Sequence, residues 1–295
     1  MFDALPGRVT VFAGLGKGAG KTTAVSAARA ALCRLSSPVG LFTIGFDKGQ
    51  AMRVSPGDVV ITSVPLARAA EARLEIIESM PGRSAIGQLC LARAVRAGAV
   101  SIAGPEHLSQ LAWAIELALK DGLVTSVLVD GAVGRMTQAG ALPRAQFVYC
   151  ATADAANYTR VAAQVEMVSA LADLPLDMET GASMDADRDR SVSFHSARSP
   201  KSAYILRVDG PLTESVLDSI PKETTHISME TFCDCFLSTA AFNRASQRYH
   251  LMVRKRVPLL GFAVALKNVK KRDFLDAAPS VSSSVVFNPM GTQIS

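Results

Sequence analysis

The sequence lacks the features of membrane, secreted and disulfide-rich proteins. No apolar run approaches the roughly 18 residues that a membrane helix needs, and the longest, Val257–Leu266, has the length of a buried strand. The amino-terminal segment carries no basic stretch ahead of a long apolar one, as a secretion signal would. The five cysteines show no paired spacing, which fits free thiols in a reducing compartment. We therefore expect a cytoplasmic protein without a membrane span.

Several kinds of binding site are missing as well. The net charge of +5 is modest, and its basic residues gather between Arg248 and Arg272, where solvated turns beside an apolar strand explain them. We therefore do not expect nucleic acid as a partner. Cys233 and Cys235 have no second cysteine pair with which to form a metal site. The Asn/Thr-Lys-x-Asp string that reads guanine is absent, which favours ATP over GTP.

What the chain does contain is an alternation of strand and helix patterns. Such alternation predicts an α/β fold, with a mostly parallel sheet and helices on both of its faces. Two expected strands, 88–95 and 99–102, are predicted to form a hairpin. The other expected strands are 8–13, 39–45, 58–63, 126–129, 146–151, 204–208, 226–229, 257–266 and 285–287, and the expected helices are 22–35, 66–80, 106–120, 158–171, 213–219, 238–247 and 273–277.

A change of composition divides the chain into three parts. Residues 1–177 form the expected nucleotide-binding domain. Residues 178–202 are polar, charged and poor in large aliphatic side chains, which predicts an exposed linker or loop. Residues 203–295 resume the alternation as a C-terminal α/β part. The sequence leaves open whether this last part extends the first sheet or forms a domain of its own.

The strongest pattern is a strand that runs into a glycine-rich loop and then into a helix, VTVFAGLGKGAGKTT. Glycines let a backbone wrap a phosphate and aim several N–H groups at it, and the following helix adds its positive end. Lys21, in a loop expected to be solvated, would reach the β- and γ-phosphates, and Thr22 would bind Mg²⁺. The predicted nucleotide-binding residues are Gly14, Gly16, Lys17, Gly18, Ala19, Gly20, Lys21, Thr22 and Thr23.

A second pattern is the apolar strand VLV that ends in Asp130. A carboxylate at the end of a strand behind such a loop is suited to hold Mg²⁺, directly or through water, across from Thr22. Arg135, a few residues later, would contact either phosphate or solvent. Asp130 is therefore predicted as both a metal ligand and a catalytic residue, together with Lys21.

Five residues separate Gly14 from the Gly-Lys-Thr string, and this loop resembles that of dethiobiotin synthetases and the amidotransferases of cobalamin synthesis. These belong to a wider P-loop group with the MinD and ParA ATPases. Where those ATPases carry an extra lysine, this chain has Gly16, and Lys17 comes one residue later. The resemblance implies a metal or catalytic role for Asp47, just after the second strand; turn capping is the alternative.

A longer set of strings, including TIGFDKGQ, PGDVVITS, VLVDGAVGR and VDGPLTESVLDSI, is similar to P-loop proteins found beside adenosylcobalamin-dependent lysine or ornithine aminomutases. That resemblance implies an ATP-driven accessory that maintains or reactivates a partner enzyme. We expect a slow Mg²⁺-dependent ATPase whose site a protein partner or a second copy of the chain completes. The alternative is an ATP-dependent small-molecule kinase or ligase of the dethiobiotin-synthetase type.

Overall fold

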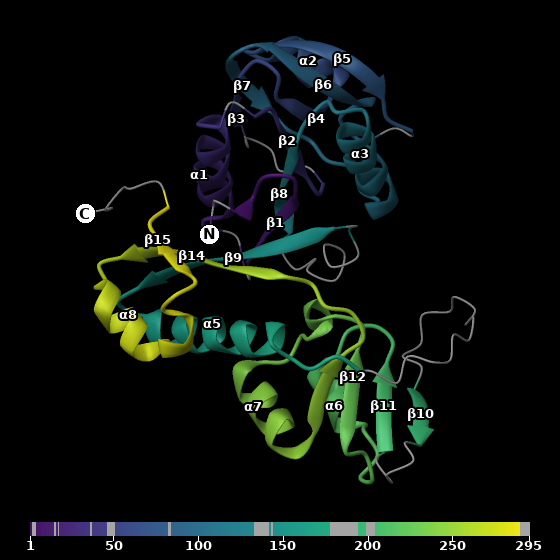
Figure 1. The fold of residues 1–295 in the computed structure, drawn as a ribbon, viewed down its shortest axis with the longest axis vertical. Helices are drawn as coiled ribbons and strands as arrows, with labels where there is room; N and C mark the ends of the chain where they lie inside the picture. The colour runs from purple at the N-terminus through teal and green to yellow at the C-terminus, as the bar shows by residue number, and fades with distance from the viewer. Residues whose placement is uncertain are drawn as a thin grey trace.

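The structure, a computed structural model, stacks two β-sheets along the long axis of the molecule (Figure 1). It describes residues 1, 4–14, 16, 18–35, 37–45, 51–81, 84–132, 142, 144–177, 194–198 and 204–289, with the backbone alone for 131, 132 and 194–198. The larger sheet has nine strands and the smaller one four. In the described residues no helix has both the length and the apolar character to cross a membrane.

The nine-stranded sheet is mostly parallel, which confirms the expected α/β class. Only the strands at one end, β6 (Leu89–Arg96) and β5 (Arg73–Ser79), run antiparallel to their neighbours. The remaining strands, in spatial order, are β15 (Val285–Phe287), β14 (Leu259–Lys267), β9 (Ala145–Asp154), β1 (Val9–Ala13), β8 (Ser126–Ala132), β2 (Val39–Thr43) and β4 (Val59–Ser63). Every residue of β1, β2 and β4 is buried, as expected of strands covered on both faces.

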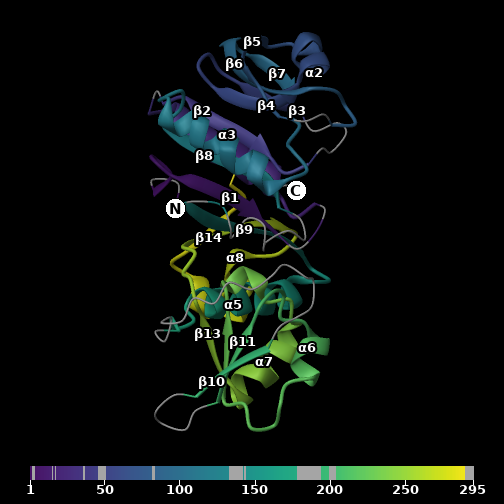
Figure 2. The same cartoon turned by 90° about the vertical axis from the view of Figure 1, so that its right-hand side faces the viewer.

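Helices cover both faces of this sheet, as expected. Helix α1 (Lys21–Cys33) packs on one face through Ala24, Val25, Ala28 and Leu32. Helices α3 (Leu108–Lys120) and α5 (Tyr158–Ala172) pack on the other, and α8 (Lys271–Ala277) and the short η3 (Pro279–Val281) lie beside α5. Figure 2, turned by 90°, looks onto the face of the sheet that α3 covers. The glycine-rich loop therefore joins a central strand to a well-packed helix.

The four-stranded sheet contains β10 (Phe194–Arg198), β11 (Tyr204–Val208), β12 (His226–Met229) and β13 (His250–Val253). Its last three strands are parallel, and helices α6 (Glu214–Asp218) and α7 (Thr239–Arg248) join them and share its apolar core. The short η2 (Phe232–Asp234) reaches the large sheet, where the rings of Phe232 and Phe147 lie 5.8 Å apart, edge to face. One hydrophobic core thus runs through both sheets.

The C-terminal part does not behave as one unit. Residues 204–253 supply three of the four strands of the small sheet, whereas β14 and β15 return to the large sheet, where β14 pairs with β9. The small sheet is thus an insertion between α5 and β14. The apolar run Val257–Leu266 explains the return, because only the large sheet can cover most of it on both sides. Within the expected linker 178–202, residues 194–198 form the edge strand β10.

Two local expectations were wrong. Residues 66–80 are not one helix, because the chain forms a short α2 (Val64–Ala69) and then the edge strand β5, whose charged side chains face solvent. The hairpin expected at 88–102 is also absent. β6 pairs with β4 and β5, while β7 (Gly98–Ser101) pairs with β3 (Ala51–Val54) in a separate ribbon. Gly98 permits this change of direction, since a Cβ there would lie 2.5 Å from the backbone nitrogen of Ala72.

Candidate functional site

The glycine-rich loop follows β1 and needs its glycines for two separate reasons. A Cβ on Gly14 would lie 2.4 Å from the carbonyl oxygen of Cys150, so only glycine lets the loop pack against β9. Gly18 and Gly20 both adopt φ of +82°, the left-handed region that disfavours side chains. Gly20 is the N-cap of α1 and has no side chain to occupy the first N–H groups of the helix. The amino-terminal end of a helix carries partial positive charge, which favours an anion at this position.

Lys21 closes the loop rather than extending into solvent. Its Nζ donates a hydrogen bond of 2.8 Å to the carbonyl oxygen of Gly16, and the residue is only 8% exposed. The expectation of a solvated lysine was therefore wrong, because the side chain folds back across the loop that it follows. Burial lowers the pKa of the Lys21 ammonium below its ordinary value, while the negative charge of Asp130 acts in the opposite direction. The loop holds a positive charge that has lost part of its hydration.

Thr22 and Asp130 meet at the carboxyl edge of the large sheet. The Thr22 Oγ1 donates a hydrogen bond of 2.8 Å to Asp130 Oδ2, although 108 residues separate the two in sequence. Parallel pairing of β1 with β8 aligns the ends of these strands, and Asp130 is 1% exposed. Carboxylate and hydroxyl oxygens are the hard ligands that Mg²⁺ prefers. Two of the three predicted metal ligands are thus brought together, and their chemistry fits the ion.

Of the other predicted site residues, some lie within the described part of the chain and some outside it. Ala19 is buried beneath the loop, and Thr23 is exposed on the first turn of α1. Lys17 and Asp47 lie outside the described residues, and so does Arg135. No cluster of three or more His, Cys, Asp or Glu side chains that could hold a metal occurs in the described part of the chain. A metal at this edge would therefore also need oxygen ligands from phosphate or water.

Sequence reasoning missed a contact on the other side of the loop. Thr152, near the end of β9, donates a hydrogen bond of 2.9 Å from its Oγ1 to the carbonyl oxygen of Gly18. Next to it lies a cavity of about 210 Å³, lined by the loop, by the end of β9 and by Arg160 and Gln164 of α5. The contact between Thr152 and Gly18 could have been predicted if β9 had been placed beside β1, because Thr152 then lies at the sheet edge next to the loop.

Cys150 lies directly below the loop in β9. Burial raises the pKa of its thiol well above the ordinary value, and the nearby charge of Asp130 raises it further. The thiol therefore stays protonated at neutral pH and acts as a packing group rather than as a nucleophile. Among the described residues of this edge, the remaining candidate functional groups are the lysine, the threonine and the aspartate.

We compared the chain with protein-family models, with curated proteins and with solved structures, and none of the three comparisons found a match.

Proposed function

We propose that the chain is a P-loop nucleotide-binding protein that takes ATP with Mg²⁺ at residues 14–22. The single observation that carries this proposal is the 2.8 Å hydrogen bond between Thr22 and Asp130 at the mouth of the glycine-rich loop. It joins the residue after the loop lysine to a carboxylate at the end of the neighbouring strand. A hydroxyl and a carboxylate in these two positions are the protein ligands that a P-loop supplies to Mg²⁺.

The loop would bind the phosphates mainly through backbone groups. Gly18 and Gly20 are in the left-handed conformation that lets a loop wrap an anion, and α1 would add the positive end of its dipole. Lys21 would exchange its bond to the Gly16 carbonyl for phosphate oxygens, which accept stronger, charge-assisted bonds. Its incomplete hydration favours that exchange, since little solvent has to be removed from the ammonium.

The fit to a metal depends on Thr22 and Asp130. A bound Mg²⁺ would neutralise charge that develops on the phosphate oxygens. Asp130 is almost fully buried and accepts a hydrogen bond from the Thr22 hydroxyl, so both oxygens are held in place before any ligand arrives. Asp47, which lies outside the described residues, remains part of the proposed catalytic set.

The proposal includes slow ATP hydrolysis that a partner enzyme, or a second copy of the chain, accelerates. P-loop hydrolysis commonly needs an additional cation near the transferred phosphoryl group, and such a group supplied from outside is worth roughly 10³–10⁵ in rate. Phosphate release from the purified chain, measured over a range of protein concentrations, tests this part. Fast release that does not depend on concentration would contradict it.

Titration calorimetry with ATP, in the presence of Mg²⁺ and of a chelator, tests the central proposal. For the native chain we expect Mg²⁺ to strengthen ATP binding. In Asp130→Asn the amide keeps the shape of the side chain and loses its charge, so the benefit of Mg²⁺ should fall by about tenfold, which is about 1.4 kcal/mol.

Asp121→Asn, an exposed aspartate after α3, is the matched control and should keep the full benefit. An unchanged Mg²⁺ effect in Asp130→Asn would remove Asp130 from the site. Absence of ATP binding by the native chain would overturn the proposal.

A further inference from the structure

A second cavity lies at the opposite edge of the large sheet from the glycine-rich loop. It has a volume of about 390 Å³ and lies between the last turn of α5, the segment 256–258 and the first residues of β14. β9 and β14 run parallel to β1, so the start of β14 and the end of β1 are at opposite edges. The volume falls within the range of about 300–1,000 Å³ that is usual for small-molecule sites. None of the proposed nucleotide-binding residues lines this cavity.

Two opposite charges line the cavity. Arg256 lies on the segment that leaves the small sheet, and Asp173 is the C-cap of α5. Both side chains are exposed, and neither makes an ion pair or hydrogen bond with another described residue. The last turn of α5 carries no basic side chain, so its carbonyl groups add partial negative charge beside Asp173. The cavity lining thus contains one positively charged group, on Arg256, and a negatively charged region at Asp173 and the end of α5.

The remaining lining is a mixture of apolar side chains and hydroxyl groups. Val257, Leu259 and Phe262 contribute the apolar surface, and Phe262 is almost fully buried. Ser169, Ser280 and Ser284 add hydroxyl groups to the lining. A purely apolar ligand would leave the charges unused, and a simple anion would face Asp173. The lining is matched instead by a ligand that carries both charges and a short apolar group.

We infer that this cavity binds a small aliphatic α-amino acid. Its carboxylate pairs with Arg256, whose planar guanidinium suits two-point contact with a carboxylate. Its ammonium lies at Asp173 and the carboxyl end of α5, and its side chain packs against Val257, Leu259 and Phe262. The ligand would hold α5 to the segment that connects the two sheets. This site is separate from the proposed nucleotide site and does not depend on it.

The test uses L-leucine as the probe, on the full chain without nucleotide, in titration calorimetry. Isocaproate and isoamylamine have the same branched carbon chain but lack the ammonium and the carboxylate, respectively. We expect each to bind at least about tenfold more weakly than leucine, because each loses one charge-assisted contact. A complete lack of heat with leucine, or equal binding of isocaproate or inorganic phosphate, overturns the inference.

Variants locate the binding site. Arg256→Gln and Asp173→Asn should each weaken leucine binding by about tenfold, through loss of the carboxylate and the ammonium contact respectively. Lys255→Gln and Asp218→Asn are exposed, matched controls outside the cavity and should leave the affinity unchanged. Leucine affinity that survives both Arg256→Gln and Asp173→Asn means that the amino acid binds elsewhere, which overturns the inference. Because no nucleotide is present, this result stands apart from the outcome of the ATP experiment.

Discussion

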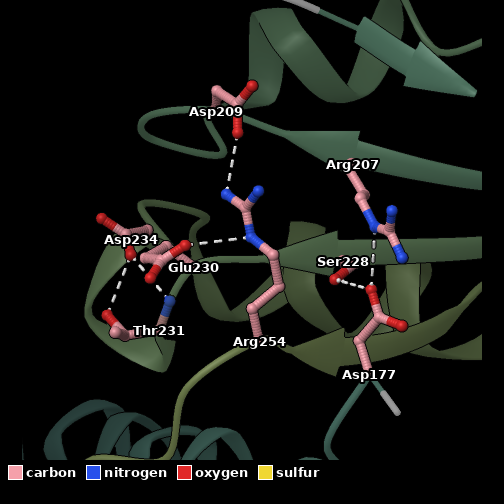
Figure 3. Close-up of polar contacts among 8 residues, drawn as sticks. All are labelled: Asp177, Arg207, Asp209, Ser228, Glu230, Thr231, Asp234 and Arg254. Carbon is pink, nitrogen blue, oxygen red and sulfur yellow. Dashed lines mark hydrogen bonds and ion pairs between the residues drawn. The ribbon is translucent and has the colours of Figure 1, made fainter. Parts of the chain in front are cut away.

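The small sheet and the carboxyl edge of the large sheet use their ionisable side chains in different ways. In the small sheet, opposite charges pair with each other: Arg207 with Asp177, and Arg254 with Asp209 and Glu230 (Figure 3). At the carboxyl edge of the large sheet, Lys21 donates to a neutral backbone carbonyl, and burial lowers the pKa of its ammonium. The first arrangement stabilises the fold, whereas the second holds a charge at a cost in stability. Such a cost is expected where a site must receive a ligand.

The position of each charged residue supports this distinction. Asp177 lies where the chain enters the small sheet, and its Oδ2 also accepts a hydrogen bond of 2.8 Å from Ser228. Arg254 lies where the chain leaves it, directly after β13. These ion pairs therefore fasten both ends of the insertion. Lys21 instead follows the left-handed glycines, and its hydrogen-bond partner is the Gly16 carbonyl oxygen rather than a carboxylate.

The largest effect should come from Asp177→Ala. The change removes the acceptor of the Arg207 Nε, at 3.1 Å, and of the Ser228 hydroxyl. Asp177 is almost fully buried, so we expect the free energy of unfolding to fall by about 3 kcal/mol. Urea unfolding measures it, with the exposed Asp218→Ala as the control that should stay within about 0.5 kcal/mol of the native chain. If the folded variant lost ATP affinity, the proposed separation of roles would be wrong.

Lys21→Met should have the opposite effect to Asp177→Ala, with a loss of ATP affinity and no loss of stability. We expect ATP affinity to fall by roughly 30–100-fold, since an ion-assisted hydrogen bond is worth about 2–3 kcal/mol. Methionine fills a similar volume and removes a poorly hydrated charge, so stability should be unchanged or higher. The lowered pKa means that the folded state binds this proton less tightly, so any gain in stability should shrink as the pH rises towards 10.5.

Calorimetry and urea unfolding measure the two effects, and Lys120→Met, on an exposed residue at the end of α3, is the control. A stability loss as large as that of Asp177→Ala would assign Lys21 to the fold rather than to a ligand.

The smallest effect should come from Glu230→Gln. The Glu230 side chain is 54% exposed, and its carboxylate lies 3.0 Å from the Arg254 Nε. Solvent screens such a pair, and Asp209 still contacts Arg254, so we expect a loss of at most about 1 kcal/mol. Urea unfolding at low salt and at about 1 M salt checks this, because the difference from the native chain should diminish at high salt. A loss that equals that of Asp177→Ala at both salt concentrations would contradict the ranking.

The centre of the large sheet could be predicted from sequence because its information is local. Strands such as Val39–Thr43 are continuous apolar runs between polar turns, and the order strand, glycine-rich loop, helix is written in consecutive residues. The meeting of Thr22 with Asp130 followed from one general rule, that parallel strands end at the same edge. Those two residues were therefore found without knowledge of the fold.

The other elements and contacts could not be predicted from sequence, because they depend on pairing between distant segments. The stretch RLEIIES alternates charged and apolar residues in a way that also fits a helix face, and only its pairing with β6 makes it a strand. Thr152 has no sequence pattern of its own and contacts Gly18 only because β9 lies beside β1. The local sequence of β14 does not indicate that it pairs with β9. The insertion of the small sheet between α5 and β14 could therefore not be predicted.

That insertion has a consequence for how the chain acquires its structure. β9 pairs on one side with β14, which begins roughly a hundred residues later, so the closing of this pair carries a large loop-closure cost. During synthesis β9 would present an apolar edge until β14 leaves the ribosome. Prior folding of the small sheet brings the two ends of the insertion together at Leu176 and Val253, which are bridged in the structure, and so shortens the effective loop. The small sheet would then promote folding of the large sheet, and the yield of correctly folded large sheet would depend on it.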